Sequence, residues 1–204
     1  MSRFRVLPGS FYRRDGETVA RELLGRYLVR RQDGSRLTLR IVETEAYLGE
    51  GDRASHAWRG QRTPRTKTLF RAGGCAYVYF IYGIHHMFNV VAAEEGVAHA
   101  VLVRAGEPVE GVERMASNRG LGCKMRPGAV AGGPGRLCQA LVIDRGYDGV
   151  GLSRGELVIT RGEPVDRRGT AVGPRIGVDY AAEAAAWPLR FAERENRHVS
   201  RPRL

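Results

Sequence analysis

Cysteine and long apolar segments are scarce in this chain. Its three cysteines, Cys75, Cys123 and Cys138, form no Cys-x-x-Cys pair and have no histidine nearby at zinc-finger spacing. We therefore expect reduced thiols, no bound metal and no other cofactor. No apolar run is long enough to span a bilayer, and residues 1–10 lack the apolar core of a signal peptide. These absences predict a cytoplasmic protein without a membrane partner.

Lysine is also scarce, so arginine carries nearly all of the positive charge. Lys67 and Lys124 are the only lysines among 33 basic residues, and the 22 acidic residues leave a formal net charge of +11. This excess of positive charge favours a polyanionic partner. A protein whose arginines are only solvated at its surface would have the same net charge, so composition alone does not separate the two. The length, the 43% of hydrophobic residues and the absence of repeats or linkers predict one domain, residues 1–204, acting as a monomer.

Hydrophobic periodicity predicts an α+β fold built on an antiparallel sheet. Two extended runs flank Asp33-Gly34, a dipeptide typical of the type I′ turn of a hairpin. Residues 49–74 are expected to form a long functional loop, residues 119–135 a second loop, and residues from about 194 onward a frayed basic tail. The predicted strands are 27–31, 36–47, 76–82, 88–93, 98–105, 156–160 and 175–178, and the predicted helices are 17–24, 107–115, 136–141 and 181–186.

Two acids lie near the end of the second predicted strand. Leu37, Leu39 and Ile41 recur at every second position and should share one face, and the same alternation puts Glu43 and Glu45 on that apolar face. A buried carboxylate is costly unless it is paired or functional. The two acids are therefore candidate catalytic groups, and pairing with nearby arginines at the sheet rim is the competing explanation.

Tyrosines are concentrated in one short segment, Tyr77 to Gly83. Each phenol hydroxyl needs a hydrogen-bond partner when it is buried, so a strand end that carries three tyrosines could instead stack on nucleic-acid bases. Regular alternation would put Tyr79 and Tyr82 on opposite faces of this strand. The basic residues that would complete a nucleic-acid surface are Arg62, Arg65, Lys67 and Arg71 before the segment and Arg104 after it.

Several motifs, taken in order along nearly the whole chain, resemble those of the alkyladenine (3-methyladenine or methylpurine) DNA glycosylase family. The most specific are Glu-Thr-Glu-Ala-Tyr at 43–47 and the Tyr-x-x-Tyr-Gly pattern at 79–83. The other matching segments are Ala-Ser-His at 54–56, Arg-Thr-Pro-Arg at 62–65, Asn89, Val-Leu-Val-Arg-Ala at 101–105, Gly-Arg-Leu-Cys-Gln-Ala-Leu at 135–141 and Pro-Leu-Arg-Phe at 188–191.

The resemblance implies a single compact domain with a curved antiparallel sheet flanked by helices, and a β-hairpin that inserts into the minor groove of DNA. It implies a DNA-repair enzyme that flips alkylated or deaminated purines out of duplex DNA and hydrolyses their N-glycosidic bond. The implied lesions are 3-methyladenine, 7-methylguanine, hypoxanthine and ethenoadenine. No lysine lies in the matched catalytic segments, so we expect an abasic product without strand cleavage.

The same resemblance suggests roles for individual residues. Glu45 would be the general base that activates water, and the pocket around the purine would be formed by Tyr47, His56 and Tyr79. Asn89 would disfavour the exocyclic amine of guanine, and Leu102 would lie at the pocket edge. The residues expected to contact DNA are Tyr82 as the wedge in the minor groove, Ile84 beside it, Arg104 near the backbone, and Arg62 and Arg65.

Two other function classes remain open from the residues alone. A metal-dependent nuclease could use Glu43, Glu45 and Asp52 as ligands for Mg²⁺. A non-catalytic nucleic-acid-binding module could use the tyrosines for stacking, in which case Glu45 would be dispensable. Neither class explains the ordered series of matched motifs. The segments 84–88 and 119–133 depart from the family pattern, and we expect these departures to affect specificity more than the class of reaction.

Overall fold

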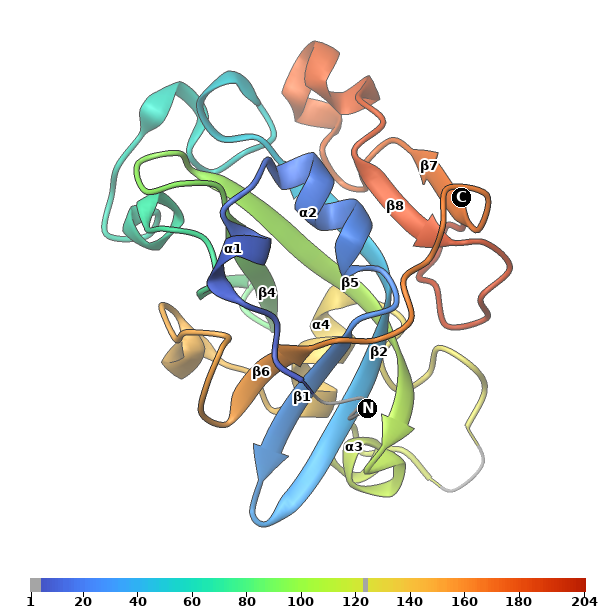
Figure 1. The fold of residues 1–204 in the computed structure, drawn as a ribbon. Coiled ribbons are helices and arrows are strands. Elements are labelled where there is room, and N and C mark those ends of the chain that lie inside the picture. Colours follow the sequence, from blue (N-terminus) through green and yellow to red (C-terminus); the bar gives the residue numbers. More distant parts are fainter. Residues whose placement is uncertain (1–4, 123–124) are drawn as a thin grey trace.

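An antiparallel sheet of eight strands organises the chain (Figure 1). The computed structural model describes residues 5–122 and 125–204, so the expectations for Cys123 and Lys124 lie outside the described residues. Over these two ranges, no helix combines the length and apolarity that crossing a bilayer requires. The predicted α+β class with a curved antiparallel sheet is confirmed.

The helices are short and the strands supply most of the regular structure. The strands are β1 Tyr27–Gln32, β2 Ser35–Tyr47, β3 Ala76–Ile81, β4 His85–Ala92, β5 His99–Glu110, β6 Leu157–Thr160, β7 Thr170–Gly173 and β8 Arg190–Glu193. The α-helices are α1 Gly9–Tyr12, α2 Gly16–Leu23, α3 Val112–Asn118 and α4 Pro134–Leu141. The 3-10 helices are η1 Gly49–Gly51, η2 Trp58–Gly60, η3 Lys67–Phe70, η4 Arg145–Tyr147 and η5 Asp179–Ala186.

β2 is the central strand of the sheet. The order β3-β4-β5-β2-β1-β6 places β5 along one edge of β2 and β1 along the first half of the other edge. Beyond residue 42, β8 replaces β1 on that second edge and pairs Glu43 with Ala192 and Glu45 with Arg190. The C-terminal part of the chain therefore completes the hydrogen bonding of β2 where the two acids lie.

Local capping and turn chemistry account for the elements predicted best. α2 begins after Asp15, whose carboxylate accepts hydrogen bonds from the amides of Glu17 at 2.7 Å and Thr18 at 3.3 Å. The turn between β1 and β2 has positive φ at both Asp33 and Gly34, as a type I′ turn requires. Both features depend on neighbouring residues alone, which is why the sequence pattern identified them.

Three predicted elements are wrong, and tertiary pairing explains each. Residues 107–110 continue β5, since Glu107 and Pro108 pair with β2 at an irregular register, and α3 begins only after Gly111. Residues 175–178 form no strand, because Arg175 turns inward to bind other parts of the chain. Residues 181–186 lie in 3-10 turns that are broken at Ala182. The short strands β7 and β8 were not predicted.

The C-terminal segment also differs from the frayed tail that was expected. Val199 and Ser200 are buried, and the Ser200 amide donates a hydrogen bond of 2.7 Å to Glu43. The segment is therefore fixed to the centre of the sheet, by a buried carboxylate 157 positions earlier in the chain.

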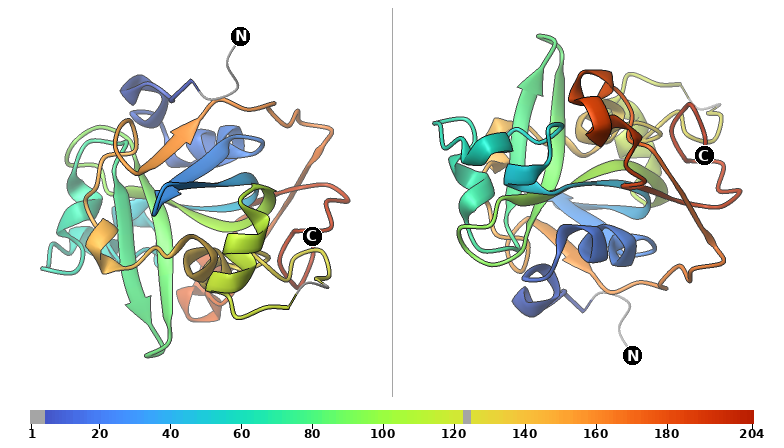
Figure 2. Two further views of the ribbon diagram at one scale, coloured as in Figure 1. Left: turned by 90° about the horizontal axis from the view of Figure 1, so that it is seen from below. Right: turned by 90° about the horizontal axis from the view of Figure 1, so that it is seen from above.

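The two faces of the sheet are covered by different parts of the chain. The main hydrophobic cluster joins α2 and α4 to one face. The opposite face is covered by the loop between β2 and β3, by η5 and by the C-terminal segment. The β3–β4 hairpin extends away from the body of the molecule, as both views of Figure 2 show.

Candidate active site

The sheet register brings separate sequence motifs into one row. Glu45 on β2 pairs with Leu102 on β5, Leu102 pairs with Asn89 on β4, and Asn89 pairs with Tyr77 on β3. Residues paired directly across adjacent strands place their side chains on the same face. Four strands thus present one line of side chains on the face opposite the main hydrophobic cluster.

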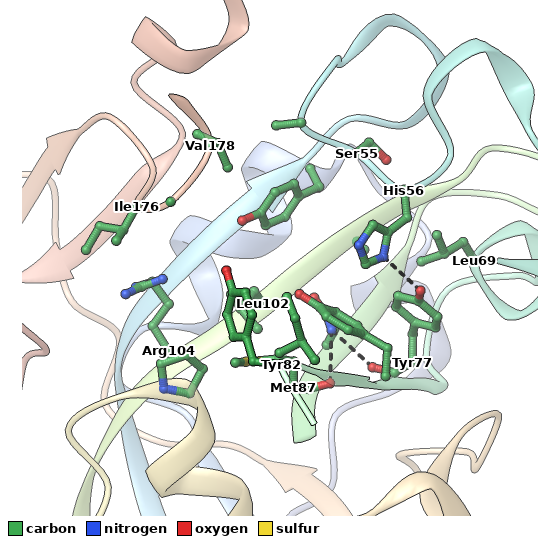
Figure 3. Close-up of a pocket in the computed structure, with 18 of the residues that line it drawn as sticks. Ser55, His56, Leu69, Tyr77, Tyr82, Met87, Leu102, Arg104, Ile176 and Val178 are labelled. Carbon is green, nitrogen blue, oxygen red and sulfur yellow. Dashed lines mark hydrogen bonds between the residues drawn. The ribbon is translucent and has the colours of Figure 1, made fainter. Parts of the chain in front are cut away.

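A cavity of about 300 Å³ lies over this row. Figure 3 shows His56 and Tyr77 on one side of it and Arg104 and Ile176 on the other. We call it the tyrosine cavity, because five tyrosines line it: Tyr47, Tyr77, Tyr79, Tyr82 and Tyr180. It also includes His56, Asn89, Leu102 and Arg104, so it brings together the predicted substrate-binding residues.

Glu45 lies beneath the cavity wall with no exposed surface. Its Oε1 accepts a hydrogen bond from the Ile176 amide at 2.8 Å and lies 3.2 Å from Nη1 of Arg104. Its Oε2 accepts a hydrogen bond from the Tyr47 hydroxyl at 2.9 Å. Three residues that line the cavity therefore hold one carboxylate, and Oε2 has only one of these donors.

A β-bulge in β2 sets the direction of the two acids and corrects the predicted alternation. The register with β5 shifts between Ile41 and Glu43 and again between Glu43 and Thr44. Val42 then packs with the C-terminal segment, on the same side as Glu43, whereas Ile41 belongs to the main cluster. The acids do share a face, but it is the face opposite Ile41, because one extra residue reverses the alternation.

Glu43 anchors the structure around Glu45. Its Oε1 accepts hydrogen bonds from Nε of Arg104 at 3.0 Å and from Nε of Arg190 at 2.7 Å, and both oxygens accept hydrogen bonds from Ser200. Two buried carboxylates and two buried guanidinium groups thus balance in charge. Burial lowers the pKa of Arg104, but the charges of Glu45 and Glu43 outweigh it, so the net shift of that pKa is upward.

Tyr47 is held by a second buried ion pair. Arg175 and Asp52 are both fully buried, with Nη2 of Arg175 2.8 Å from Oδ1 of Asp52, and the guanidinium lies 4.8 Å from the Tyr47 ring centre. Burial and the charge of Glu45 raise the pKa of Tyr47 well above its usual value. Tyr47 therefore stays protonated and donates to Glu45. Burial also raises the pKa of Tyr79.

His56 is neutral at physiological pH. Burial, with a smaller effect from Arg65, lowers its pKa from 6.5 to about 4. Its Nδ1 lies 2.9 Å from the Tyr77 hydroxyl, whose own pKa burial raises to about 12, and Nη2 of Arg65 lies 3.4 Å from its Nε2. A cation beside Nε2 favours a lone pair there and a proton on Nδ1, which makes His56 the donor to Tyr77.

This shift predicts a pH-dependent contribution to folding stability. Below about pH 6.5 the unfolded chain protonates His56 while the folded chain does not until about pH 4, so stability falls as the pH is lowered through this window. The loss attributable to His56 is at most about 3 kcal/mol. Urea unfolding at about pH 7.5 and about pH 4.5 should show a larger loss for wild type than for His56→Gln. Equal losses would contradict a buried neutral histidine.

Asn89 has a fixed orientation in the cavity. It is 3% exposed, and its amide nitrogen donates to the carbonyls of Tyr77 at 3.2 Å and Met87 at 3.3 Å. With its donors bound to the backbone, the side chain cannot rotate freely when a ligand arrives. Leu102, between Glu45 and Asn89 in the row, supplies an apolar part of the cavity floor.

Exposed apolar residues mark the tip of the β3–β4 hairpin. Tyr82 is 79% exposed and Ile84 is 64% exposed, which is costly without a partner surface. Tyr82 has φ of +56° and leaves the strand there, so it lines the cavity together with Tyr79 instead of facing away from it. Arg62 is exposed but lies 4.4 Å from the Phe70 ring centre, outside the cavity lining.

The acids of the nuclease hypothesis are not arranged to bind a metal. Asp52 binds Arg175, while Glu43 and Glu45 share Arg104. Within residues 5–122 and 125–204, no group of three histidine, cysteine, aspartate or glutamate side chains is close enough to hold an ion. Carboxylates that are already paired with arginines are poor ligands for a hard cation.

Some residues of the site were missed by sequence reasoning. The Ile176 amide and Arg175 come from a segment whose composition carries no catalytic signal, and Tyr180 lies in the alanine-rich region after it. Their proximity to Glu45 arises only from folding. Tyr77 was noted only as part of the tyrosine segment. Its hydrogen-bond partner His56 lies 21 positions earlier in the chain, so the pair forms only in the fold.

Comparison with known proteins identifies similar chains over nearly the full length. The family model described as "Methylpurine-DNA glycosylase (MPG)" matches residues 10–197. A protein of Myxococcus xanthus (strain DK1622) named "Putative 3-methyladenine DNA glycosylase" is 50% identical over 195 residues, which cover 96% of this chain and 93% of that protein. Proteins with the same name from Methanocella arvoryzae and Desulfitobacterium hafniense (strain Y51) are 46% and 43% identical, each over at least 93% of both chains.

Proposed function

Because the chain belongs to the methylpurine-DNA glycosylase family, we propose that its tyrosine cavity receives a damaged purine flipped out of duplex DNA. The protein is a hydrolase of N-glycosyl bonds in DNA and acts in the repair of alkylated bases. The observation that carries the proposal for this chain is that Tyr47, Tyr79 and Asn89 line one cavity near an exposed hairpin tip. Glu45 lies directly behind this lining, hydrogen-bonded to Tyr47.

The lining of the cavity suits an alkylated purine. Alkylation at N3 or N7 makes the base cationic, and the faces of Tyr47 and Tyr79 would attract a cation more than a neutral base. Arg175 already occupies one face of Tyr47, and since Arg175 does not line the cavity, the other face remains for the purine. The volume of about 300 Å³ lies within the range for small-molecule sites.

Neutral lesions need a different interaction. His56 is neutral, because burial lowers its pKa to about 4, so it would offer a hydrogen bond to hypoxanthine or ethenoadenine and not a charge. Asn89 would select against guanine, because its side chain is fixed by two backbone carbonyls and cannot turn away from an exocyclic amine.

Glu45 would act as the general base. Its Oε1 has two donors and its Oε2 has one, so a lone pair on Oε2 can accept a hydrogen bond from a water molecule aimed at C1′ of the flipped nucleotide. Because the carboxylate is buried, this water would be separated from bulk solvent, and the negative charge would also stabilise a cationic sugar. The leaving group is the free purine.

Tyr82 would fill the gap that the flipped base leaves in the DNA stack. The exposure of Tyr82 at the projecting tip, beside the exposed Ile84, supports a contact of both residues with the minor groove. Extruding a base costs a few kcal/mol, and an aromatic ring inserted in its place offsets part of that cost.

Replacing Tyr82 by serine should therefore weaken binding to lesion-containing duplex by about 1 to 3 kcal/mol without lowering folding stability. The side chain is 79% exposed, so little packing is lost. Fluorescence anisotropy and thermal unfolding measure the two effects. Val109→Ser, at an exposed position at the end of β5, is the control and should change neither. Unaltered DNA affinity in Tyr82→Ser would argue against a wedge.

The proposed reaction can be tested on duplexes that each carry one 3-methyladenine, 7-methylguanine, hypoxanthine or ethenoadenine. In EDTA, wild type should release the free base, and the strand should break only after alkali treatment, because no lysine acts as a nucleophile. Strand cleavage before alkali would contradict a monofunctional glycosylase, and loss of activity in EDTA would favour the nuclease. Binding without base release from any duplex would favour the non-catalytic module.

A further inference from the structure

Two tyrosines of the tyrosine cavity each have an arginine over the ring. The guanidinium carbon of Arg175 lies 4.8 Å from the Tyr47 ring centre, and that of Arg65 lies 5.4 Å from the Tyr79 ring centre. Both tyrosines line the cavity, whereas neither arginine does. Each arginine therefore lies behind a ring that would face a bound purine, on the side away from the ligand.

Buried partners hold Arg175 in this position. Its side chain has no exposed surface, and its Nη2 donates to Oδ1 of Asp52 at 2.8 Å and to the Ala184 carbonyl at 3.0 Å. Its Nη1 donates to the Ala46 carbonyl at 2.9 Å. Among the described residues, its Nε has no hydrogen-bond partner. The guanidinium is thus fixed behind Tyr47 and cannot move away when a base enters the cavity.

The charges of the two arginines act on the tyrosines in front of them. Burial is the largest cause of the raised pKa of Tyr47, and the charge of Arg175 opposes that rise. Burial is also the largest cause of the raised pKa of Tyr79, and there the charge of Arg65 opposes it. A nearby cation has this effect because it favours the anionic form of a phenol. Each tyrosine is therefore under a positive potential from its arginine.

A cation on one face of an aromatic ring changes what the opposite face attracts. The negative faces of a tyrosine ring attract a cation more than a neutral group. A second cation on the far face is repelled by the first, and a protein interior screens this repulsion less than water does. A neutral purine stacks on the same ring without such a penalty. The two arginines consequently reduce the advantage that the tyrosines alone would give to a cationic purine.

We propose that Arg175 and Arg65 are specificity-determining residues, which disfavour cationic purines relative to neutral purines of the same shape. They act through Tyr47 and Tyr79, and not by touching the base. This inference rests on the proposed function, because it takes the tyrosine cavity as the site of the flipped purine. The cavity consequently binds neutral and cationic purines with more similar affinities than its tyrosines alone would give.

The test uses two DNA duplexes that differ only in the charge of one base. One carries 7-methyladenine, which is a cation, and the other carries 7-methyl-7-deazaadenine, which has the same shape and is neutral. A 2′-fluoro sugar at this nucleotide prevents hydrolysis, so fluorescence anisotropy gives Kd for each duplex. A pH of about 7.5 keeps His56 neutral, because burial lowers its pKa to about 4. The ratio of the neutral to the cationic Kd measures the preference for the cation.

Three variants are compared with wild type. Arg65→Gln removes one arginine, and Asp52→Leu with Arg175→Met removes the other without leaving a buried charge unpaired. Arg62→Gln is the matched control, because it removes the same charge from the same loop. Arg62 lies 4.4 Å from the ring centre of Phe70, which does not line the cavity. Since Arg65 is exposed, Arg65→Gln should keep the fold and decides the question if the buried double variant does not fold.

The Kd ratio should rise about 2- to 5-fold in Arg65→Gln and up to about 30-fold in the buried double variant, the factors that correspond to cation–π contributions at exposed and desolvated sites. Arg62→Gln should keep the wild-type ratio, because it changes the affinity for both duplexes by the same factor. A ratio in Arg65→Gln equal to that in Arg62→Gln would overturn the proposal.

Release of 7-methyladenine from a duplex with an ordinary deoxyribose is measured in parallel with wild type. A shifted Kd ratio without any base release would support this proposal and refute the proposed reaction. Base release with an unshifted ratio would refute this proposal alone, and the absence of both would refute the two together.

Discussion

Glu45→Gln is expected to slow single-turnover release of a damaged purine by about 10²- to 10⁴-fold, the usual contribution of a general base. The amide cannot take a proton from water, and it also removes the negative charge that stabilises a cationic sugar. The fold should persist, because a glutamine oxygen can still accept from the Ile176 amide and its nitrogen can donate to the Tyr47 hydroxyl. DNA binding should therefore remain.

The control for this substitution is Glu50→Gln, an exposed acid in the loop that follows β2. It removes the same charge a few residues away and should leave base release at the wild-type rate. If Glu45→Gln released purines as fast as Glu50→Gln, then Glu45 would have a structural role only, comparable to that of Glu43. Loss of DNA binding together with activity would instead indicate that the buried charge cluster had collapsed.

Asp52→Asn should lower the free energy of unfolding by about 3 to 5 kcal/mol, the usual cost of removing one partner from a buried ion pair. Both side chains of the pair are fully buried, and Asp52 also accepts hydrogen bonds of 3.0 Å from the amides of Leu48 and Ala54. An asparagine would present its NH₂ group to one of these donors. Arg175 would keep a buried charge without the carboxylate that balances it, held by the carbonyls of Ala46 and Ala184.

The matched control is Asp33→Asn, which breaks the exposed pair between Asp33 and Arg114. Asparagine tolerates the positive φ of this turn, so the cost should stay within about 1 kcal/mol. Urea unfolding of both variants measures the difference. A double variant, Asp52→Leu with Arg175→Met, should recover part of the lost stability, since no unpaired charge is then buried. Equal costs for Asp52→Asn and Asp33→Asn would contradict the account of this pair.

Local chemistry made some of the fold predictable. The Asp15 cap and the Asp33-Gly34 turn depend on residues adjacent in sequence, and both formed as predicted. The wrong elements depend on distant partners. Glu107 and Pro108 carry helix-start signals, but β2 is long enough to pair with them, and the hydrogen bonds of the sheet outweigh a local preference for helix.

The site was predictable only in part, for a similar reason. Alternation indicated that Glu43 and Glu45 share a face of the sheet. The bulge at Val42 puts them on the face opposite Ile41, and no residue type in this segment predicts a bulge. The family resemblance supplied the candidate roles, whereas the row from Glu45 to Tyr77 comes from strand register. The Ile176 amide is a backbone group, so no sequence pattern could have identified it as a partner of Glu45.

Glu43 shows why the two acids had to be distinguished by structure. In sequence the pair is symmetrical, two glutamates separated by one threonine. In the fold, Glu43 binds Arg104, which lines the tyrosine cavity, and also Arg190 and Ser200, which do not. The three donors to Glu45 all line that cavity. The acid with partners at the cavity is the one suited to act on a ligand there.

The most direct test of the account is a structure of Glu45→Gln bound to a duplex that carries one hypoxanthine. We expect the purine to lie in the tyrosine cavity beside Tyr47 and Tyr79, with Tyr82 in the vacated position of the stack. A water molecule should bridge residue 45 and C1′ of the flipped nucleotide. A hypoxanthine that remains stacked in the duplex, or a base bound elsewhere on the protein, would contradict the claim that this cavity is where the damaged purine is excised.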